Sequence, residues 1–213
     1  MTRTLLTKKN RNWLDSNAYW NDRIPVDIEM GAGHLNAYRA YQQFSAGQWG
    51  SEDSIPARGW DYASVDVYAY REYEIKPKLQ ENSYVAITLV WDRLVELEDK
   101  NGNQKYDLGE NFYNRGLNDL NIYLMPIDSN YTSESVCASR SQVDSLEHIF
   151  CPIPKTGRYK IRVDFPERVN DRVQFYGLAW WSLPVDRVGG DLAEVRSQKR
   201  QKPASAQDAR GGR

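Results

Sequence analysis

The chain lacks long apolar runs, a cysteine framework and an excess of charge of either sign. No stretch approaches the roughly 18–20 apolar residues that a bilayer span needs, so no membrane span is expected. The 28 Lys and Arg against 29 Asp and Glu give a net charge of −1. The chain therefore lacks the excess of positive charge that is typical of nucleic-acid-binding proteins. Residues 1–10 lack the apolar core of a signal peptide. A water-exposed globular chain without a nucleic-acid partner is therefore expected.

Only two cysteines occur, Cys137 and Cys151, so neither a disulfide framework nor a four-cysteine zinc site is available. The two residues lie on segments that could pair as neighbouring strands. One bridge between them, or two free buried thiols acting as small apolar side chains, both satisfy the sequence.

Alternation of apolar and polar residues dominates the chain from about residue 60. The pattern has the period of two that is typical of β-strands, and turn residues bound each run. The runs are Val85–Trp91, Leu120–Leu124 and Tyr159–Phe165, with Val65–Ile75 and Val173–Leu183 as further candidates. Because no helical period separates them, the sequence predicts a mainly β protein, an antiparallel, jelly-roll-like β-sandwich over residues 60–184. Its predicted core includes Val85, Leu89, Leu120, Ile161 and Val163.

The residues on either side of this region follow other patterns. Residues 1–46 contain a short amphipathic helix with Asn36 at its N-cap and an apolar stripe ending at Phe44. Residues 189–213 have almost no large apolar side chains, and they carry six Lys or Arg against three Asp or Glu. We therefore expect a helical segment before the sandwich and a disordered tail after it.

One polar loop has the ligand spacing of a calcium site. Counted from Asp99, side-chain oxygens stand at positions 1, 3, 5, 9 and 12 of an EF-hand loop, and a backbone carbonyl is available at position 7. The predicted ligands of a Ca²⁺ ion are Asp99, Asn101, Asn103, Lys105 (through its carbonyl), Asp107 and Glu110. Gln104 replaces the glycine expected at position 6, and strands rather than helices flank the loop. The alternative is a polar hairpin, because Asn, Asp and Gly also favour turns.

A catalytic constellation is missing from the sequence. Only His34 and His148 could act as imidazole bases, and His148 lies in a strand-like run where a structural role is the simpler interpretation. No nucleophile, zinc or phosphate-binding motif accompanies them. The chain alone is therefore not expected to be an enzyme, although an unrecognised site is a third hypothesis behind the two functions given below.

Several segments resemble subtilisin-like serine proteases, the subtilases. Gly31–Ala40 (GAGHLNAYRA) is similar to the Gly-x-Gly turn and final helix that close the subtilase catalytic domain, and Thr4–Thr7 resembles the end of a preceding helix. Four later segments resemble, in order, motifs of the C-terminal β-domain of some subtilases: Ile87–Asp92, Leu117–Tyr123, Asp144–His148 and Thr156–Val163. Asn121 stands where the second motif has an aspartate, and Ser145 stands where the third has an asparagine.

The resemblance implies a non-catalytic accessory domain, because the subtilase Asp, His and Ser motifs have no counterpart in this sequence. It implies a subtilase catalytic domain as partner, a bound calcium ion, and the secreted or extracellular location of that family. The alternative is an independent extracellular module that binds carbohydrate or cell-surface ligands. For that alternative, exposed tryptophans would form a stacking platform, either Trp180 with Trp181 or Trp49 with Trp60.

Overall fold

The computed structural model describes residues 16–33 and 35–184. His34, the Thr4–Thr7 segment and the predicted 189–213 tail lie outside these residues. No helix in the described part of the chain is long and apolar enough to cross a bilayer.

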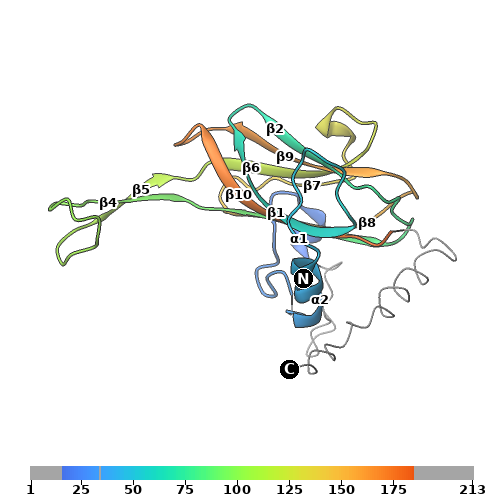
Figure 1. Cartoon of the computed structure of the whole chain (residues 1–213), viewed down its shortest axis with the longest axis horizontal. Coiled ribbons are helices and arrows are strands. Elements are labelled where there is room, and N and C mark those ends of the chain that lie inside the picture. The colour runs from blue at the N-terminus through green and yellow to red at the C-terminus, as the bar shows by residue number, and fades with distance from the viewer. Residues whose placement is uncertain (1–15, 34, 185–213) are drawn as a thin grey trace, which may run out of the picture.

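Two four-stranded antiparallel sheets form the body of the molecule, with one hairpin projecting from it (Figure 1). Sheet I has the order β1 (Arg58–Asp66), β10 (Val173–Trp181), β3 (Tyr84–Trp91) and β8 (Leu146–Pro152). Sheet II has the order β2 (Tyr70–Glu74), β9 (Tyr159–Glu167), β6 (Asp119–Pro126) and β7 (Cys137–Ser139). The hairpin pairs β4 (Leu94–Leu97) with β5 (Phe112–Gly116), and a short 3₁₀ helix, η2 (Thr132–Glu134), precedes β7.

Strands that follow one another along the chain mostly lie in opposite sheets. From β1 to β3 the chain alternates between the sheets, and it alternates again from β7 to β10. This repeated crossing gives a jelly-roll strand order, so the predicted mainly β, antiparallel sandwich is confirmed.

The core lies between the two sheets. All five side chains predicted to lie there are fully buried in one apolar cluster: Val85, Leu89, Leu120, Ile161 and Val163. Because alternate residues of a strand face opposite sides of the sheet, the period-two pattern located this layer correctly.

One predicted strand, Val65–Ile75, is wrong as a single element. The chain leaves sheet I after Asp66, passes through Tyr68 in a left-handed conformation (φ 63°), and enters sheet II at Tyr70. The amide of Ala69 closes this turn on the carbonyl of Asp66 at 3.1 Å. Apolar side chains continue on both sides of the corner, so the alternation alone does not reveal the change of sheet.

A polar network joins the sheets inside the core. Tyr73 of β2 donates its hydroxyl proton to Asp61 of β1 at 2.8 Å, and its oxygen lies 2.8 Å from the hydroxyl of Tyr176 on β10. Burial, followed by the nearby Tyr176, raises the pKa of Tyr73, so the neutral phenol is the form that holds the sheets together here.

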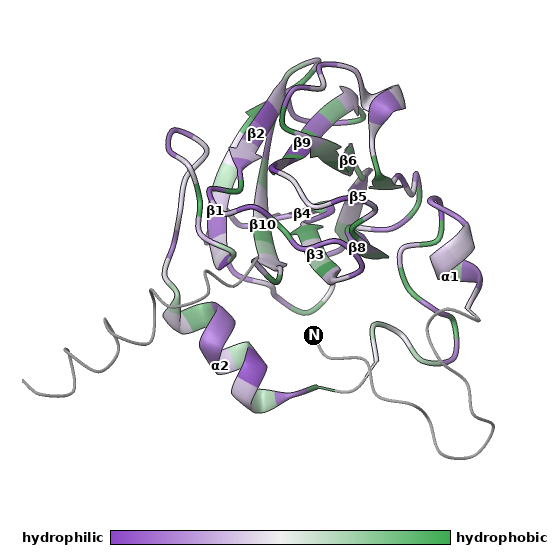
Figure 2. Ribbon diagram, turned by 90° about the vertical axis from the view of Figure 1, so that its right-hand side faces the viewer, coloured by the Kyte–Doolittle hydropathy of each residue, from purple (hydrophilic) through white to green (hydrophobic). Residues whose placement is uncertain are grey.

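The N-terminal segment carries two helices, α1 (Asn17–Trp20) and α2 (Ala37–Ser45). The Asn36 side chain accepts from the Arg39 amide at 3.0 Å, which confirms the predicted N-cap. Phe44, near the end of α2, stacks on Trp60 of β1 with ring centroids 5.6 Å apart. Figure 2 shows that most of α2 is set apart from the strands.

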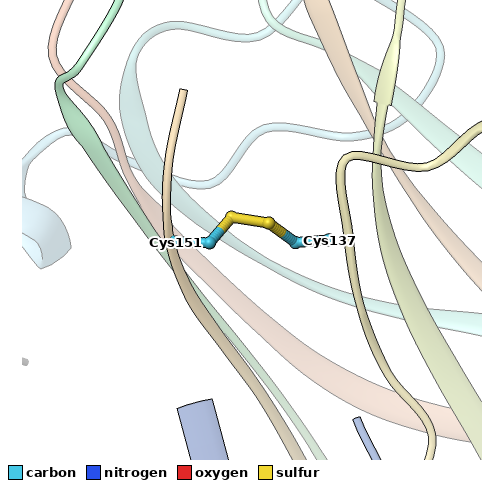
Figure 3. Close-up of a disulfide and its surroundings, with 2 residues drawn as sticks. All are labelled: Cys137 and Cys151. Atoms are coloured by element: carbon cyan, nitrogen blue, oxygen red, sulfur yellow. A yellow bond between two sulfur atoms is a disulfide. The ribbon is translucent and has the colours of Figure 1, made fainter. Parts of the chain in front are cut away.

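A disulfide connects Cys137 and Cys151 (Figure 3), with Cα atoms 6.7 Å apart. Of the two alternatives left open by the sequence, the bridge is the one formed. The two cysteines do not sit on paired strands, because β7 pairs with β6 and β8 pairs with β3. The bond therefore links the edge strands of opposite sheets.

Removal of the disulfide is expected to lower stability substantially. Closure of a loop of this length restricts the unfolded chain and is worth about 3 kcal/mol. The Cys137→Ser/Cys151→Ser double variant should therefore melt several degrees lower than the wild type, measured by circular dichroism. Reductant should lower the melting temperature of the wild type and leave that of the double variant unchanged. If the wild type and the double variant melted at the same temperature, the disulfide would make no contribution to stability.

Candidate functional site

The predicted calcium loop lies at the tip of the projecting β4–β5 hairpin (Figure 1). It therefore stands in a β context, as expected. Several apolar side chains of the hairpin are exposed, and Tyr106 stacks on Phe112 with centroids 5.4 Å apart. An isolated two-stranded ribbon is only marginally stable in water, so the loop that joins its strands has a direct effect on its order.

Side-chain oxygens of the loop organise its backbone. The Asp99 carboxylate accepts from the amides of Gly102, Asn103 and Gln104 at 2.7–3.1 Å. At the other end, Glu110 accepts from the amides of Lys100 and Asp107, each at 2.9 Å, and only 7% of this residue is exposed. Glu110 therefore ties both ends of the loop together.

The centre of the loop is occupied by Asp107. Its Oδ2 accepts from the amide groups of Asn101 and Asn103 at 2.6 and 2.7 Å. The amide of Lys105 donates to the Asn103 side chain at 2.7 Å, so this residue is also part of the ring of contacts. The structure thus brings all six predicted positions into one compact loop.

The backbone at position 6 has the conformation that the EF-hand pattern requires. Gln104 has φ 60°, in the left-handed region where glycine is normally favoured, and Gly102 has φ 76°. The departure from the motif at Gln104 therefore does not prevent the turn.

The charge balance of the loop is compatible with a hard cation. In the described residues no lysine or arginine forms an ion pair with Asp99, Asp107 or Glu110, since Lys100 pairs with Glu98 instead. No group of three or more His, Cys, Asp or Glu side chains in that part of the chain converges on a point where it could hold a metal. An ion at the tip would therefore depend on amide and carbonyl oxygens as well as carboxylates.

His148 occupies a structural position. It is buried on β8, and its Nδ1 lies 2.8 Å from the Thr88 hydroxyl of the neighbouring strand β3. It lines a cleft of about 500 Å³ between the α1 segment and the disulfide edge. The second histidine, His34, lies outside the described residues.

The four tryptophans considered as a stacking platform do not form one. Trp180 is fully buried in the core, whereas Trp181 faces the other side of β10, beneath Arg39 and Arg58. Trp60 is covered by Phe44, and Trp49 is partly exposed. Tyr62 and Phe175 form an exposed aromatic pair on the outer face of sheet I, with ring centroids 6.0 Å apart, which sequence reasoning missed.

Glu147 is a buried acid that no sequence motif indicated. Its carboxyl accepts from the Ser139 hydroxyl and from the Ser141 amide. Burial raises its pKa to about 8, although both hydrogen bonds act in the opposite direction. Because it stands in a strand next to His148, its sequence context does not distinguish it from a surface residue.

Comparisons with known proteins define no family for this chain. No protein-family model and no curated protein matches it. Among solved structures, the chain is similar to PliG from Aeromonas hydrophila, a periplasmic inhibitor of g-type lysozyme, at 13% identity and a TM-score of 0.35. The match covers 64% of this chain and 99% of that one. This likeness is too distant to carry a functional argument.

The buried Glu147 carboxyl predicts a specific dependence of stability on pH. Its folded pKa is raised, so its contribution is fully present below its ordinary value of 4.5 and is lost as pH rises towards about 8. The Glu147→Gln variant lacks this loss. Across that window its free energy of unfolding should therefore increase relative to the wild type, by up to about 1.4 kcal/mol per pH unit.

Urea unfolding between pH 4 and 9 measures this difference. Glu134→Gln, which changes an exposed acid in η2, is the matched control and should follow the wild type at every pH. Parallel curves for Glu147→Gln and the wild type would show that the pKa of Glu147 is the same in the folded and the unfolded protein.

Proposed function

We propose that this chain is a non-catalytic accessory β-domain that packs against a subtilisin-like catalytic domain outside the cytoplasm. The observation that carries the proposal is the apolar surface left exposed on the segment that resembles the end of that catalytic domain. A disulfide is compatible with an oxidising compartment, which supports the location.

The N-terminal segment exposes far more apolar surface than a finished domain normally does. Ile28 is 97% exposed. Five other apolar side chains of this segment are also largely exposed: Trp20, Leu35, Tyr38, Tyr41 and Phe44. No residue of α2 is buried. Contiguous exposed apolar surface of this kind is typical of an interaction site. In a whole subtilase, these faces would pack on the rest of the α/β domain.

Calcium would strengthen the projecting hairpin of this domain. Asp99, Asp107 and Glu110, with the side-chain oxygens of Asn101 and Asn103 and the carbonyl of Lys105, would hold the ion. The two amides would have to turn their oxygens towards it. When bound, Ca²⁺ would neutralise three carboxylates that no described cation pairs with. Two neutral ligands make a modest affinity the expectation.

The alternative function, an independent carbohydrate-binding module, is favoured by one observation. Tyr62 and Phe175 present stacked rings on the outer face of sheet I, and both side chains are exposed. Sugar rings stack on such aromatic surfaces. Retention on insoluble polysaccharide that is lost in Tyr62→Ala would support this function over the first.

Binding to a truncated catalytic domain tests the main proposal. A subtilisin-like catalytic domain that ends before its closing Gly-x-Gly helix lacks the element that residues 31–44 resemble. The full chain should bind it in sedimentation experiments. Tyr38→Ser/Tyr41→Ser should weaken binding by more than tenfold, because each tyrosine loses about 1–2 kcal/mol of apolar burial.

Tyr68→Ser is the control, since Tyr68 is equally exposed but lies at the corner between β1 and β2. It should bind like the wild type. Absence of binding, or binding that all variants share, would contradict the proposed docking.

Thermal melting in millimolar calcium and in chelator tests the hairpin site. A hundredfold excess over Kd adds about 2.7 kcal/mol, which raises the melting temperature by several degrees. Glu110→Gln should show a smaller shift than the wild type, because it removes a bidentate ligand. Glu98→Gln, on the same hairpin but outside the loop, should show the full wild-type shift. If calcium shifts the wild type and Glu110→Gln equally, or shifts neither, the loop is only a polar turn.

A further inference from the structure

The outer face of sheet II brings together two carboxylates and an amide. Asn121 on β6 is the cross-strand partner of Asp164 on β9. Asp119 lies two residues earlier on β6, and the strand register shifts between Asp119 and Asn121. Such irregularities reorient side chains and often occur beside functional sites. The core residues Leu120 and Ile122 face the other side of the same strand.

Three oxygen atoms of this group are buried without a hydrogen-bond partner. They are Oδ1 of Asp119, Oδ1 of Asn121 and Oδ1 of Asp164. Asn121 is only 6% exposed, so water has little access to it. An unsatisfied buried polar group destabilises the folded protein, and it does so more strongly if it is charged. Three such atoms at adjacent positions point to a ligand that would accept their lone pairs.

The neighbouring arginines are already engaged with other acids. Arg162 donates to Glu72 at 2.8 Å and to the carbonyl of Asn130 at 3.0 Å. Arg140 donates to Asp22 at 2.7 Å. Each guanidinium thus hydrogen-bonds to an acid other than Asp119 or Asp164, and Arg162 shares Glu72 with Lys160.

We propose that Asp119, Asn121 and Asp164 bind a calcium ion on the outer face of sheet II, separate from the hairpin loop. All three ligands are oxygens of the kind that Ca²⁺ prefers, and bidentate carboxylates with water complete a shell of six to eight. The two carboxylates do not suffice alone, so the amide oxygen of Asn121 is an essential ligand. Zinc is disfavoured because it prefers histidine and cysteine ligands, which these three positions lack.

Reversal of a stability order tests the site. All variants carry Glu110→Gln, which removes a bidentate ligand from the proposed hairpin site. The result therefore does not depend on whether the hairpin loop binds calcium. In chelator, Asp164→Asn should melt no lower than this parent, because it changes a half-buried carboxyl group whose Oδ1 has no hydrogen-bond partner. In millimolar calcium the parent should gain several degrees and the variant almost nothing, which reverses or abolishes the difference.

Asp66→Asn is the matched control, since it removes an exposed acid from sheet I. It should respond to calcium like the parent. A calcium shift shared by parent and Asp164→Asn, or absent from both, would overturn the site. Magnesium that shifted the parent as much as calcium does would overturn the assignment of the ion.

A second measurement does not depend on melting. Tyr123 lies two residues after Asn121 on the same face of β6 and should sensitise the luminescence of bound Tb³⁺. Asn121→Leu should weaken Tb³⁺ binding more than tenfold while its circular dichroism spectrum stays that of the parent. Unchanged luminescence in a folded Asn121→Leu protein would refute the site.

Discussion

The apolar layer between the two sheets is the constraint on which the rest of the structure depends. Each strand contributes alternate side chains to it, and removal of apolar surface from water is the largest favourable contribution to the folding of such a domain. The hydrogen bonds between Asp61, Tyr73 and Tyr176 cross this layer and fix how the two sheets face each other. At the opposite edge, the Cys137–Cys151 bond has the same effect covalently.

The outer faces of the sandwich depart from the usual pattern, because they bury polar and charged side chains. An antiparallel sheet normally has a solvated outer face with polar side chains in water. Here the outer side of sheet II buries Asn121, Lys160 and Arg162, and Glu147 is buried on β8. Polar groups in such places need partners, which Glu72 supplies to both cations. The oxygens of Asp119, Asn121 and Asp164 are the exception, and this exception is the basis for the proposed second ion.

The two parts outside the sandwich have a common property. The β4–β5 hairpin and α2 both expose apolar side chains and both depend on local chemistry, the hairpin on Glu110 and the helix on Asn36. Neither has a large buried face of its own. The proposed contacts beyond this domain, with an ion at the hairpin and with an α/β domain at α2, fall on these two parts.

Local patterns were sufficient to predict much of this protein. Alternation located β3, β6 and β9 and five buried core residues, because strand periodicity depends only on neighbouring residues. The spacing of its residues was enough to predict the loop from Asp99 to Glu110, because all of its hydrogen bonds lie within ten residues of chain. Asn36 was identified as an N-cap for the same reason.

Contacts between distant segments were decided only by the tertiary structure. The corner at Tyr68 divided one expected strand between two sheets, since the apolar pattern continues through it. The cysteines bridge opposite sheets, which spacing cannot distinguish from a pair on one sheet. Trp180 points into the core, whereas Trp181 points away from it. Asp164 lies opposite Asn121, 43 residues away in the chain, because of the strand register alone. Burial of a polar side chain depends on what folds over it, and that information is spread over the whole sequence.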